Sequence, residues 1–386
     1  MTRRILHAVA SAGDTCGGVS AAIASLGAVE SAAGHDATLV TLYRPEQGIT
    51  LLSGLPRWYD VELVRPGRLA GRFHGGSRLT EALRRLVPQH DLVVLHGVFD
   101  LASVVGGRTA RRFGVPYLLW PHGSLDPYDL RKHSWAKHKL AFLWRESLDG
   151  AAALMCTSQR EADRLETFGA TTRRLVLPLP LPDDVQPLDR REARRRCQLP
   201  ADARIVLFLG RIDAKKGLLP LLSGFARAAQ PEDLLVIAGS GNPKLTAQLR
   251  RQADELRCRV IFTGWVDGAR SRELLAAADV FALISDNENF AVAVAEAAQA
   301  GVATLISDEV YLGDELVPAG ASAVCGRSPD LVARALRELL ADPHRRRRMG
   351  AAGRAWARAN LQVSAVAETY LELVGEVMRE CRASVY

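Results

Sequence analysis

The sequence has no run of about 18 uncharged apolar residues, so we expect no membrane-spanning helix. Its six cysteines are scattered and form no Cys-x-x-Cys pair, which argues against a zinc site or a disulfide framework and favours a reducing cytosol. No zinc finger, helix-turn-helix or RNA-binding aromatic strand is evident, so nucleic acid is not an expected partner. We interpret residues 1–10, a basic start and a short apolar run, as a first strand, with a signal peptide as the alternative.

The rest of the composition is that of an ordinary globular protein. Hydrophobic residues make up 48% and charged residues 24% of the 386 positions, which excludes a disordered, collagen-like or coiled-coil chain. At about 100–200 residues per domain, this length predicts two domains, with three as the alternative. The net charge of +7 fits an anionic substrate or membrane surface, and equally an Arg-rich composition without a special partner.

Short apolar runs alternate with longer amphipathic stretches along the whole chain. This alternation predicts an α/β fold in which parallel sheets are built from βαβ units. Residues 178–187 are rich in proline and acidic side chains, which is typical of an extended linker between domains. We therefore predict a Rossmann-like N-terminal domain over 1–182 and a Rossmann-like C-terminal domain over 190–361.

Two basic residues follow the first predicted strand of the second domain. Arg211 and Lys216 come directly after the apolar run 204–209, and so near the carboxyl edge of the sheet, where such folds bind ligands. Arg can bind two oxygens of an anion at once and Lys acts as a point charge, so the pair is suited to clamp an anion. The alternative is two solvated charges on a loop.

Glycines follow two further predicted strands of this domain. Gly239 would let backbone N–H groups approach a phosphate or a sugar closely, and Gly264 is placed to present backbone groups to a nucleobase. Many strand-to-helix turns use glycine, so a plain turn explains either position as well.

Two glutamates, Glu288 and Glu296, are separated by seven residues. If residues 289–300 form a helix, Glu288 stands just before it and Glu296 follows about 2.2 turns later, so both carboxylates lie near one face. The segment between them is otherwise apolar, and a carboxylate on a buried helix needs a partner. We expect a ligand hydroxyl or a cation, with a structural ion pair as the alternative.

The order and spacing of these motifs resemble the retaining GT-B glycosyltransferases of family GT4, and the resemblance covers essentially the whole second domain. It implies two Rossmann-like domains that face each other across a cleft, with a last helix, 362–386, that crosses back to the first domain. It also implies that Arg211 and Lys216 hold the donor diphosphate. Glu288 would then contact the transferred sugar, and Glu296 would bind the nucleotide ribose.

The peptide groups of Asn289, Phe290 and Ala291 would lie over the sugar and the diphosphate. The sequence departs from the family pattern at two positions, because the family usually has Gly where Ala291 stands and Pro where Ala303 stands. Ala291 adds a methyl group at the point where the backbone approaches the donor.

The implied activity is transfer of a sugar from a UDP- or GDP-linked donor to a hydroxyl acceptor, a polysaccharide or glycolipid intermediate, with retention at the anomeric carbon. The sequence has no Asp-x-Asp motif, so we expect no metal or other cofactor, with Arg211 and Lys216 stabilising the leaving diphosphate. Two alternatives stay open: a catalytically silent binding subunit, and a nucleotide-sugar epimerase of the same fold.

The resemblance extends to the first domain. Gly17 and Gly18 open a predicted helix whose N–H groups suit an anion, and they resemble the family's Gly-Gly loop over the donor; a plain turn is the alternative. His122 follows a predicted strand, and we predict that it contacts the sugar or acceptor and helps to handle a proton, with a hydrogen-bonding wall residue as the alternative. His96 and Asp126 are predicted acceptor-binding residues.

Residues 131–145 combine basic side chains and histidines with Trp135, Phe142 and Trp144. This pattern predicts peripheral contact of a cytoplasmic protein with the anionic inner face of the plasma membrane, beside a lipid-linked acceptor. The alternative is a surface helix whose aromatic side chains pack inward. Together with residues 121–127, the segment resembles bacterial GT4 enzymes of surface-polysaccharide assembly.

Overall fold

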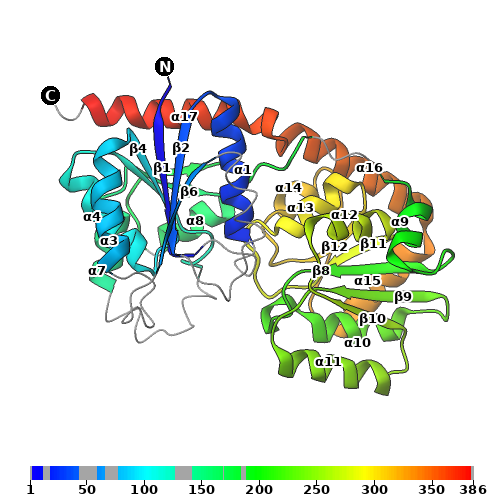
Figure 1. The fold of residues 1–386 in the computed structure, drawn as a ribbon. Coiled ribbons are helices and arrows are strands. Elements are labelled where there is room, and N and C mark those ends of the chain that lie inside the picture. Colours follow the sequence, from blue (N-terminus) through cyan, green and yellow to red (C-terminus); the bar gives the residue numbers. More distant parts are fainter. Residues whose placement is uncertain are drawn as a thin grey trace. The chain divides into compact units, whose positions relative to one another are not determined.

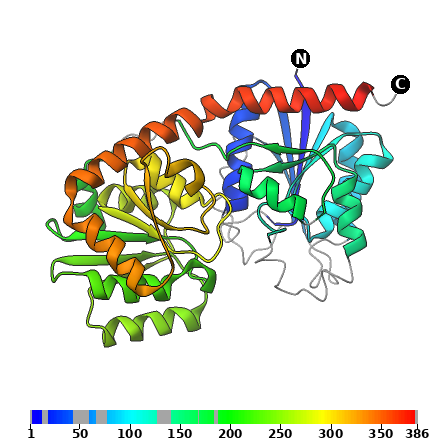
Figure 2. The same ribbon diagram turned by 180° about the vertical axis from the view of Figure 1, so that it is seen from behind.

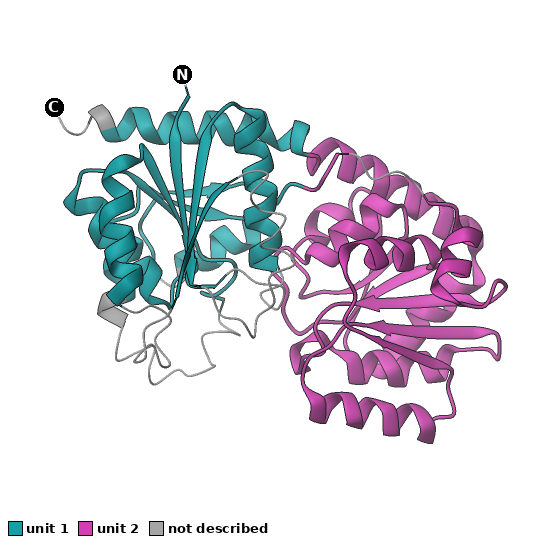
Figure 3. Cartoon of the chain, in the orientation of Figure 1, with its two compact units in different colours: residues 1–180, 363–386 teal, residues 181–362 magenta. Residues whose placement is uncertain are grey.

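The computed structural model describes residues 2–11, 18–42, 59–65, 77–126, 141–167, 169–183 and 188–383. The chain divides into two compact units, one formed by Met1–Pro180 and Val363–Tyr386 and the other by Leu181–Gln362 (Figure 3). The division falls inside the proline-rich segment that the sequence suggested as a linker. Each unit consists of a parallel sheet with helices on both faces (Figures 1 and 2).

The sheet of unit 1 has seven strands in the order β3-β2-β1-β4-β5-β6-β7. Their bounds are β1 Arg4–Val9, β2 Asp36–Leu42, β3 Asp60–Val64, β4 Leu92–His96, β5 Tyr117–Trp120, β6 Ala153–Cys156 and β7 Arg174–Val176. The strand order reverses at the neighbouring parallel strands β1 and β4: β2 and β3 follow on the side of β1, and β5, β6 and β7 on the side of β4. The carboxyl ends of these two strands form the topological switch point, where doubly wound sheets bind ligands.

The helices of unit 1 are α1 Gly18–Ala32, α3 Ser77–Leu86, η4 Val87–Gln89, α4 Leu101–Arg112, α7 Ala141–Asp149, α8 Gln159–Thr167 and α17 Val363–Ala383. As the resemblance implied, the last helix belongs to the first domain: α17 packs on α1 (Figure 2). Arg173 ties it to the sheet through ion pairs of 2.9 Å with both Glu376 and Glu380.

The sheet of unit 2 has six strands in the order β10-β9-β8-β11-β12-β13. Their bounds are β8 Arg204–Leu209, β9 Asp233–Ala238, β10 Val260–Gly264, β11 Val280–Leu283, β12 Ala303–Ser307 and β13 Ser322–Cys325. The helices are α9 Arg190–Cys197, η5 Ala214–Lys216, α10 Leu218–Ala228, α11 Pro243–Glu255, α12 Gly268–Ala277, α13 Val292–Ala300, α14 Gly313–Leu316, α15 Pro329–Ala341 and α16 Pro343–Asn360. Here the switch point lies between β8 and β11.

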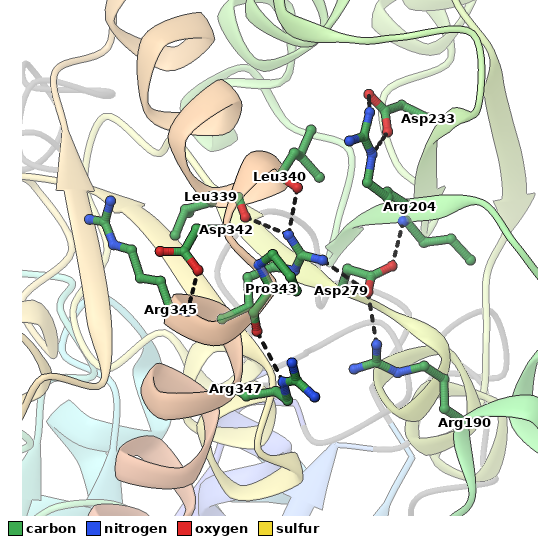
Figure 4. A network of polar contacts seen from close by, with 12 residues as sticks. Arg190, Arg204, Asp233, Asp279, Leu339, Leu340, Asp342, Pro343, Arg345 and Arg347 are labelled. Carbon is green, nitrogen blue, oxygen red and sulfur yellow. Dashed lines mark hydrogen bonds and ion pairs between the residues drawn. The ribbon is translucent and has the colours of Figure 1, made fainter.

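Asp279 joins several elements at the amino edge of this sheet (Figure 4). Its buried carboxylate accepts hydrogen bonds from Arg190, from Arg194 and from the backbone N–H of Ile205, each at 2.8 Å. These bonds fasten α9 to the start of β8 and satisfy a buried charge that would otherwise be strongly destabilising. A cavity of about 410 Å³ lies beside them, and among its lining residues Arg346 donates to the carbonyls of Leu339 and Leu340 at the end of α15.

One predicted helix begins later than the sequence suggested. We expected a helix over 289–300, but α13 begins at Val292 because Ala291 has a φ of 55°, in the left-handed region that a right-handed helix excludes. Glu288 therefore lies outside the helix, in a bridge with Val310, and the argument that placed the two glutamates on one helix face does not hold.

Candidate active site

Lys216 and Glu288 meet at the switch point of unit 2. Lys216 ends η5 after β8, Glu288 lies in the loop after β11, and their Nζ and Oε1 atoms are 2.5 Å apart. Glu288 is only 8% exposed, and the Ser285 hydroxyl lies 3.2 Å from the same oxygen. The structure thus brings together two residues that the sequence assigned to the diphosphate and to the sugar.

The loop that carries Glu288 is held on both sides. The Glu288 N–H donates to the carbonyl of Glu309 at 2.9 Å, and its own carbonyl accepts from the N–H of Tyr311 at 3.0 Å. The Asn287 side-chain amide donates to the Tyr311 hydroxyl at 2.9 Å. These bonds fix the carboxylate before any ligand arrives, as a preorganised site requires. Sequence reasoning did not find Tyr311, because nothing in its local sequence marks it.

Gly217 explains how η5 can approach the Glu288 loop so closely. A Cβ atom at this position would stand 1.6 Å from the carbonyl oxygen of Ile284, and the residue has a φ of 64°. Both facts exclude any residue other than glycine at position 217. The loop that follows β8 can therefore approach the end of β11 closely only because of Gly217.

Arg211 supplies an exposed cation at the same edge. Its side chain is 62% exposed, and its nearest carboxylate partner in the described part of the chain is Asp213, at 3.8 Å. An ion pair this long and exposed is weak, so the guanidinium is available for an anion.

Gly239 and Gly264 lie at the carboxyl ends of β9 and β10. A Cβ atom at Gly239 would stand 1.9 Å from the carbonyl oxygen of Gly210, so the crossing of two loops itself requires glycine here. The Gly239 N–H donates to the Gly264 carbonyl at 2.8 Å. Packing therefore accounts for Gly239, and whether either glycine also binds a donor stays a prediction.

The segment that the resemblance placed over the donor is tightly constrained. Phe290 and Ala291 are buried, and Ala291 provides the left-handed residue from which α13 starts. Within the described residues, the buried Oδ1 atom of Asn289 has no hydrogen-bond partner. A buried polar atom without a hydrogen-bond partner is destabilising, and whether Asn289 contributes to a donor site stays a prediction.

Glu296 lies on α13 and is largely buried. In the part of the chain that the structure describes, its carboxylate forms no hydrogen bond and no ion pair. Burial raises the pKa of this carboxyl to about 7, against a smaller opposing effect of the Arg272 charge. A ligand whose hydroxyl groups donate hydrogen bonds would stabilise this carboxyl group. The predicted contact with the nucleotide ribose would supply such hydroxyl groups.

Three histidines meet at the switch point of unit 1. His7 lies in β1, His96 ends β4 and His122 follows β5. His96 Nε2 is 2.9 Å from His7 Nδ1, and His96 Nδ1 is 2.9 Å from His122 Nε2. His96 is 1% exposed and both of its ring nitrogens are engaged, so in this structure neither nitrogen is open to an acceptor, and acceptor binding by His96 stays a prediction.

Asp126, the other predicted acceptor residue, is paired within the fold. Its buried carboxylate pairs with Arg164 at 2.7 Å, so its charge is already balanced within the fold and does not point to an acceptor. Nearby, Glu161 accepts from the N–H groups of Gly123 and Thr157 at 2.9 and 2.7 Å. This fixes the turn after β5 and, with it, His122, whose φ is 52°.

Several residues predicted to bind the donor or a membrane lie at the ends of the described ranges or outside them. Gly18 is the first residue of α1, whereas Gly17 and residues 131–140 lie outside the described residues. Trp144 on α7 is 8% exposed and packs edge-on against Phe99, with ring centroids 5.7 Å apart. The inward-packing alternative therefore holds for Trp144, and membrane contact through 131–145 stays a prediction. No helix within the described ranges is both long and apolar enough to cross a bilayer.

Comparison with known proteins agrees with this architecture. The family described as "Glycosyl transferases group 1" matches residues 189–356, and "Glycosyl transferase 4-like domain" matches residues 17–180. A D-inositol 3-phosphate glycosyltransferase of Thermobispora bispora is 31% identical over 343 residues, which are 81% of this chain and 77% of that protein.

Two further proteins are similar over most of their length. A GDP-mannose-dependent alpha-(1-6)-phosphatidylinositol dimannoside mannosyltransferase of Mycobacterium tuberculosis is 27% identical over 90% of this chain and 91% of its own. The structure of Anabaena HepE in complex with UDP and glucose superimposes with a TM-score of 0.80 at 18% identity, covering 97% of this chain and 100% of that one.

The two parallel α/β units define a GT-B fold, which confirms the fold class predicted from the sequence. The chain belongs to the group 1, GT4-like family of glycosyltransferases, and it is a glycosyltransferase.

Proposed function

We propose that this protein transfers a sugar from a UDP- or GDP-linked donor, bound by unit 2, to a hydroxyl group of a glycan or lipid-linked acceptor. The observation that carries the proposal is the pairing of Lys216 with Glu288 at the switch point, with Arg211 exposed at the same sheet edge. The similar M. tuberculosis and Anabaena proteins, whose names or ligands include GDP-mannose and UDP, support the nucleotide donor.

The two cations are suited to the leaving diphosphate. Departure of a nucleoside diphosphate from an oxocarbenium-like transition state concentrates negative charge on its oxygens. Arg211 is suited to bind two of these oxygens at once, and Lys216 supplies a point charge. We propose that these residues take the place of a metal ion, so that EDTA leaves activity unchanged.

The environment of Glu288 supports a proposal on stereochemistry. A covalent glycosyl-enzyme intermediate needs a free carboxylate nucleophile, but Glu288 Oε1 is held by Lys216 and faces the Ser285 hydroxyl. A carboxylate bound in this way is a weak nucleophile. Retention at the anomeric carbon is what the GT4 resemblance implies, and we therefore propose that it arises by attack of the acceptor on the face from which the diphosphate leaves, with Glu288 as a hydrogen-bonding partner of the sugar.

A transfer assay tests the proposal. UDP- and GDP-sugars are incubated in EDTA with acceptors that carry mannose, inositol phosphate or a lipid diphosphate, and nucleoside diphosphate release is measured with and without acceptor. Release that depends on acceptor, with a product whose anomeric proton coupling matches that of the donor, supports a retaining transferase. Conversion of the donor into a second nucleotide sugar without release indicates the epimerase alternative, and neither product beside nucleotide binding indicates a silent binding subunit.

A further inference from the structure

A continuous chain of hydrogen bonds crosses the interior of unit 1. It begins at the Tyr370 hydroxyl on α17, which donates to Glu30 Oε1 on α1. The Glu30 oxygens lie 2.9 and 3.0 Å from His7 Nε2, and the chain continues through His96 to His122 with nitrogen–nitrogen distances of 2.9 Å. His7 and Glu30 are fully buried, whereas His122 is partly exposed.

The order of donors and acceptors along this chain follows from Glu30. An ionised carboxylate only accepts hydrogen bonds, so His7 Nε2 must carry a proton and donate it. A neutral His7 then has a bare Nδ1, which requires His96 to donate from Nε2, and the same logic requires His122 to donate from Nε2. With Glu30 ionised and the three histidines neutral, His7, His96 and His122 are each Nε2–H tautomers, and His122 has a bare Nδ1.

We propose that Glu30 acts through His7 and His96 to make His122 a neutral base, and that the chain accepts the proton of the acceptor hydroxyl during sugar transfer. The proposal rests on the proposed function. As the acceptor oxygen bonds to the anomeric carbon and the bond to the diphosphate breaks, the hydroxyl proton passes to His122 Nδ1. Each Nε2 proton moves one step along the chain, and the last one protonates Glu30.

The reverse movement resets the chain. The proton on Glu30 returns stepwise, and His122 Nδ1 delivers it to water. Glu30, His7 and His96 are positioning residues in this scheme, because none of them touches substrate. His122 is the one member of the chain that would.

Burial explains why His122 needs such a chain. Desolvation lowers the pKa of His122 to about 3 and that of His96 well below its ordinary value, because a buried imidazolium is unstable. A single histidine in this poorly solvated position would therefore be a poor base at neutral pH, although His122 is partly exposed. Movement of protons along the chain forms no imidazolium, since the added charge neutralises the Glu30 carboxylate.

The groups around the chain support this arrangement. The Tyr59 ring packs edge-on against His7 with centroids 5.1 Å apart, its hydroxyl donating to the carbonyl of Ile23, and Trp120 stacks on His122 at 5.6 Å. Two more charged or titratable side chains lie in this electrostatic environment: Arg3 interacts with Tyr370, and His35 interacts with Glu30.

The geometry does not favour a metal site. His96 uses opposite ring nitrogens toward its two neighbours, so the three rings do not converge on one point as the ligands of a tetrahedral ion do.

Histidine nitrogen NMR of the full-length protein tests the chain directly. In ¹⁵N-histidine-labelled protein at neutral pH, His7, His96 and His122 should each show a protonated Nε2 and a bare Nδ1. In Glu30→Gln, the amide oxygen still accepts from Tyr370, so its NH₂ group faces His7 Nε2 and donates to it. All three tautomers should then switch to Nδ1–H. Tyr370→Phe is the matched control, because it keeps the carboxylate and should keep the Nε2–H tautomers.

Kinetics supply the functional readout. Glu30→Gln should lower kcat about 100-fold or more, within the usual range for loss of general base catalysis, with KM for the donor unchanged. Glu30→Asp restores the charge and should recover part of kcat.

Imidazolium or Nδ1–H forms in the wild type, or an unchanged kcat in Glu30→Gln, would overturn the relay while leaving the transferase intact. Absence of nucleotide binding would overturn the proposed function, but the NMR spectra would still report the tautomers along the hydrogen-bond chain. If Glu30→Gln does not fold, the wild-type tautomers and the Tyr370→Phe control decide.

Discussion

Lys216 Nζ lies 2.5 Å from Glu288 Oε1, so the loops after β8 and β11 are joined by a largely buried ion pair at the switch point of unit 2. The pair leaves the cation close to where a diphosphate is expected and keeps the carboxylate hydrogen-bonded. Each partner therefore serves the fold as well as the proposed donor site, and substitutions at this edge separate the two roles.

Arg211 and Lys216 should differ in their effects when substituted. Arg211→Ala should weaken binding of the preferred nucleoside diphosphate about 10-fold, the loss of one charge-assisted contact, without changing stability, because its side chain is exposed. Lys216→Gln should weaken binding at least as much and also lower the melting temperature, since it leaves the Glu288 charge buried without its partner. Titration calorimetry and thermal melts measure both effects.

The control for that comparison is Arg334→Ala, which removes a cation from an exposed face of α15. It should change neither nucleotide affinity nor stability. Equal weakening by all three substitutions would show that net charge, rather than the site, controls binding.

Glu296 should make stability depend on pH. Its pKa is raised from 4.5 to about 7 in the folded protein, so between these values the folded state holds more proton than the unfolded one. This stabilisation is fully present below pH 4.5 and is lost as pH rises through 7, an effect on the order of 3 kcal/mol. Glu296→Gln should remove this fall, so that urea denaturation at pH 8 finds the variant more stable than the wild type. A variant that is less stable at pH 8 would contradict the assignment.

Ala291 should tolerate glycine and reject larger residues. Its φ of 55° is unfavourable for an L-residue by about 1–2 kcal/mol, which glycine relieves while losing part of that gain through greater freedom in the unfolded chain. Ala291→Gly should thus be neutral or stabilising by up to about 1 kcal/mol, and Ala291→Val should be clearly destabilising. Chemical denaturation measures both. Destabilisation by glycine would show that the methyl group makes a packing contribution larger than the strain.

Asp279 should be a strong determinant of the stability of unit 2. Asp279→Ala leaves Arg194 buried without its partner and should destabilise the protein by about 3–5 kcal/mol. Asp330→Ala, which removes an exposed partner of Arg227, should change stability by less than about 1 kcal/mol. A loss of similar size in both variants would contradict the distinction between buried and exposed ion pairs.

The fold was predictable from the sequence because parallel strands buried on both faces appear as apolar runs, and helices separate them. The short strands β3 and β13 are partly exposed and have no continuous apolar run, so this signal is weak for them. The start of α13 was misplaced for a different reason. The left-handed conformation of Ala291 follows from tertiary packing, and alanine itself gives no signal for it.

The candidate site was predictable where residues follow strands directly. Lys216 and His122 were found in this way, since the carboxyl ends of parallel strands gather at one edge, whereas Glu288 was found from its spacing to Glu296 and from the family resemblance. Glu30 was not found, although a glutamate in the otherwise apolar helix α1 was a usable signal. Its link to His7 and Tyr370 depends on contacts between residues distant in the chain, which periodicity does not reveal.

A thermal-shift screen with UDP, GDP, ADP and dTDP in EDTA tests the central claim most directly, because a ligand that binds only the folded state raises the melting temperature by mass action. We predict that one of these nucleotides, UDP or GDP, stabilises the wild type, that Lys216→Gln clearly reduces the shift and that Arg334→Ala retains it. No shift with any nucleotide, or a shift that Lys216→Gln leaves unchanged, would contradict the donor site proposed for unit 2.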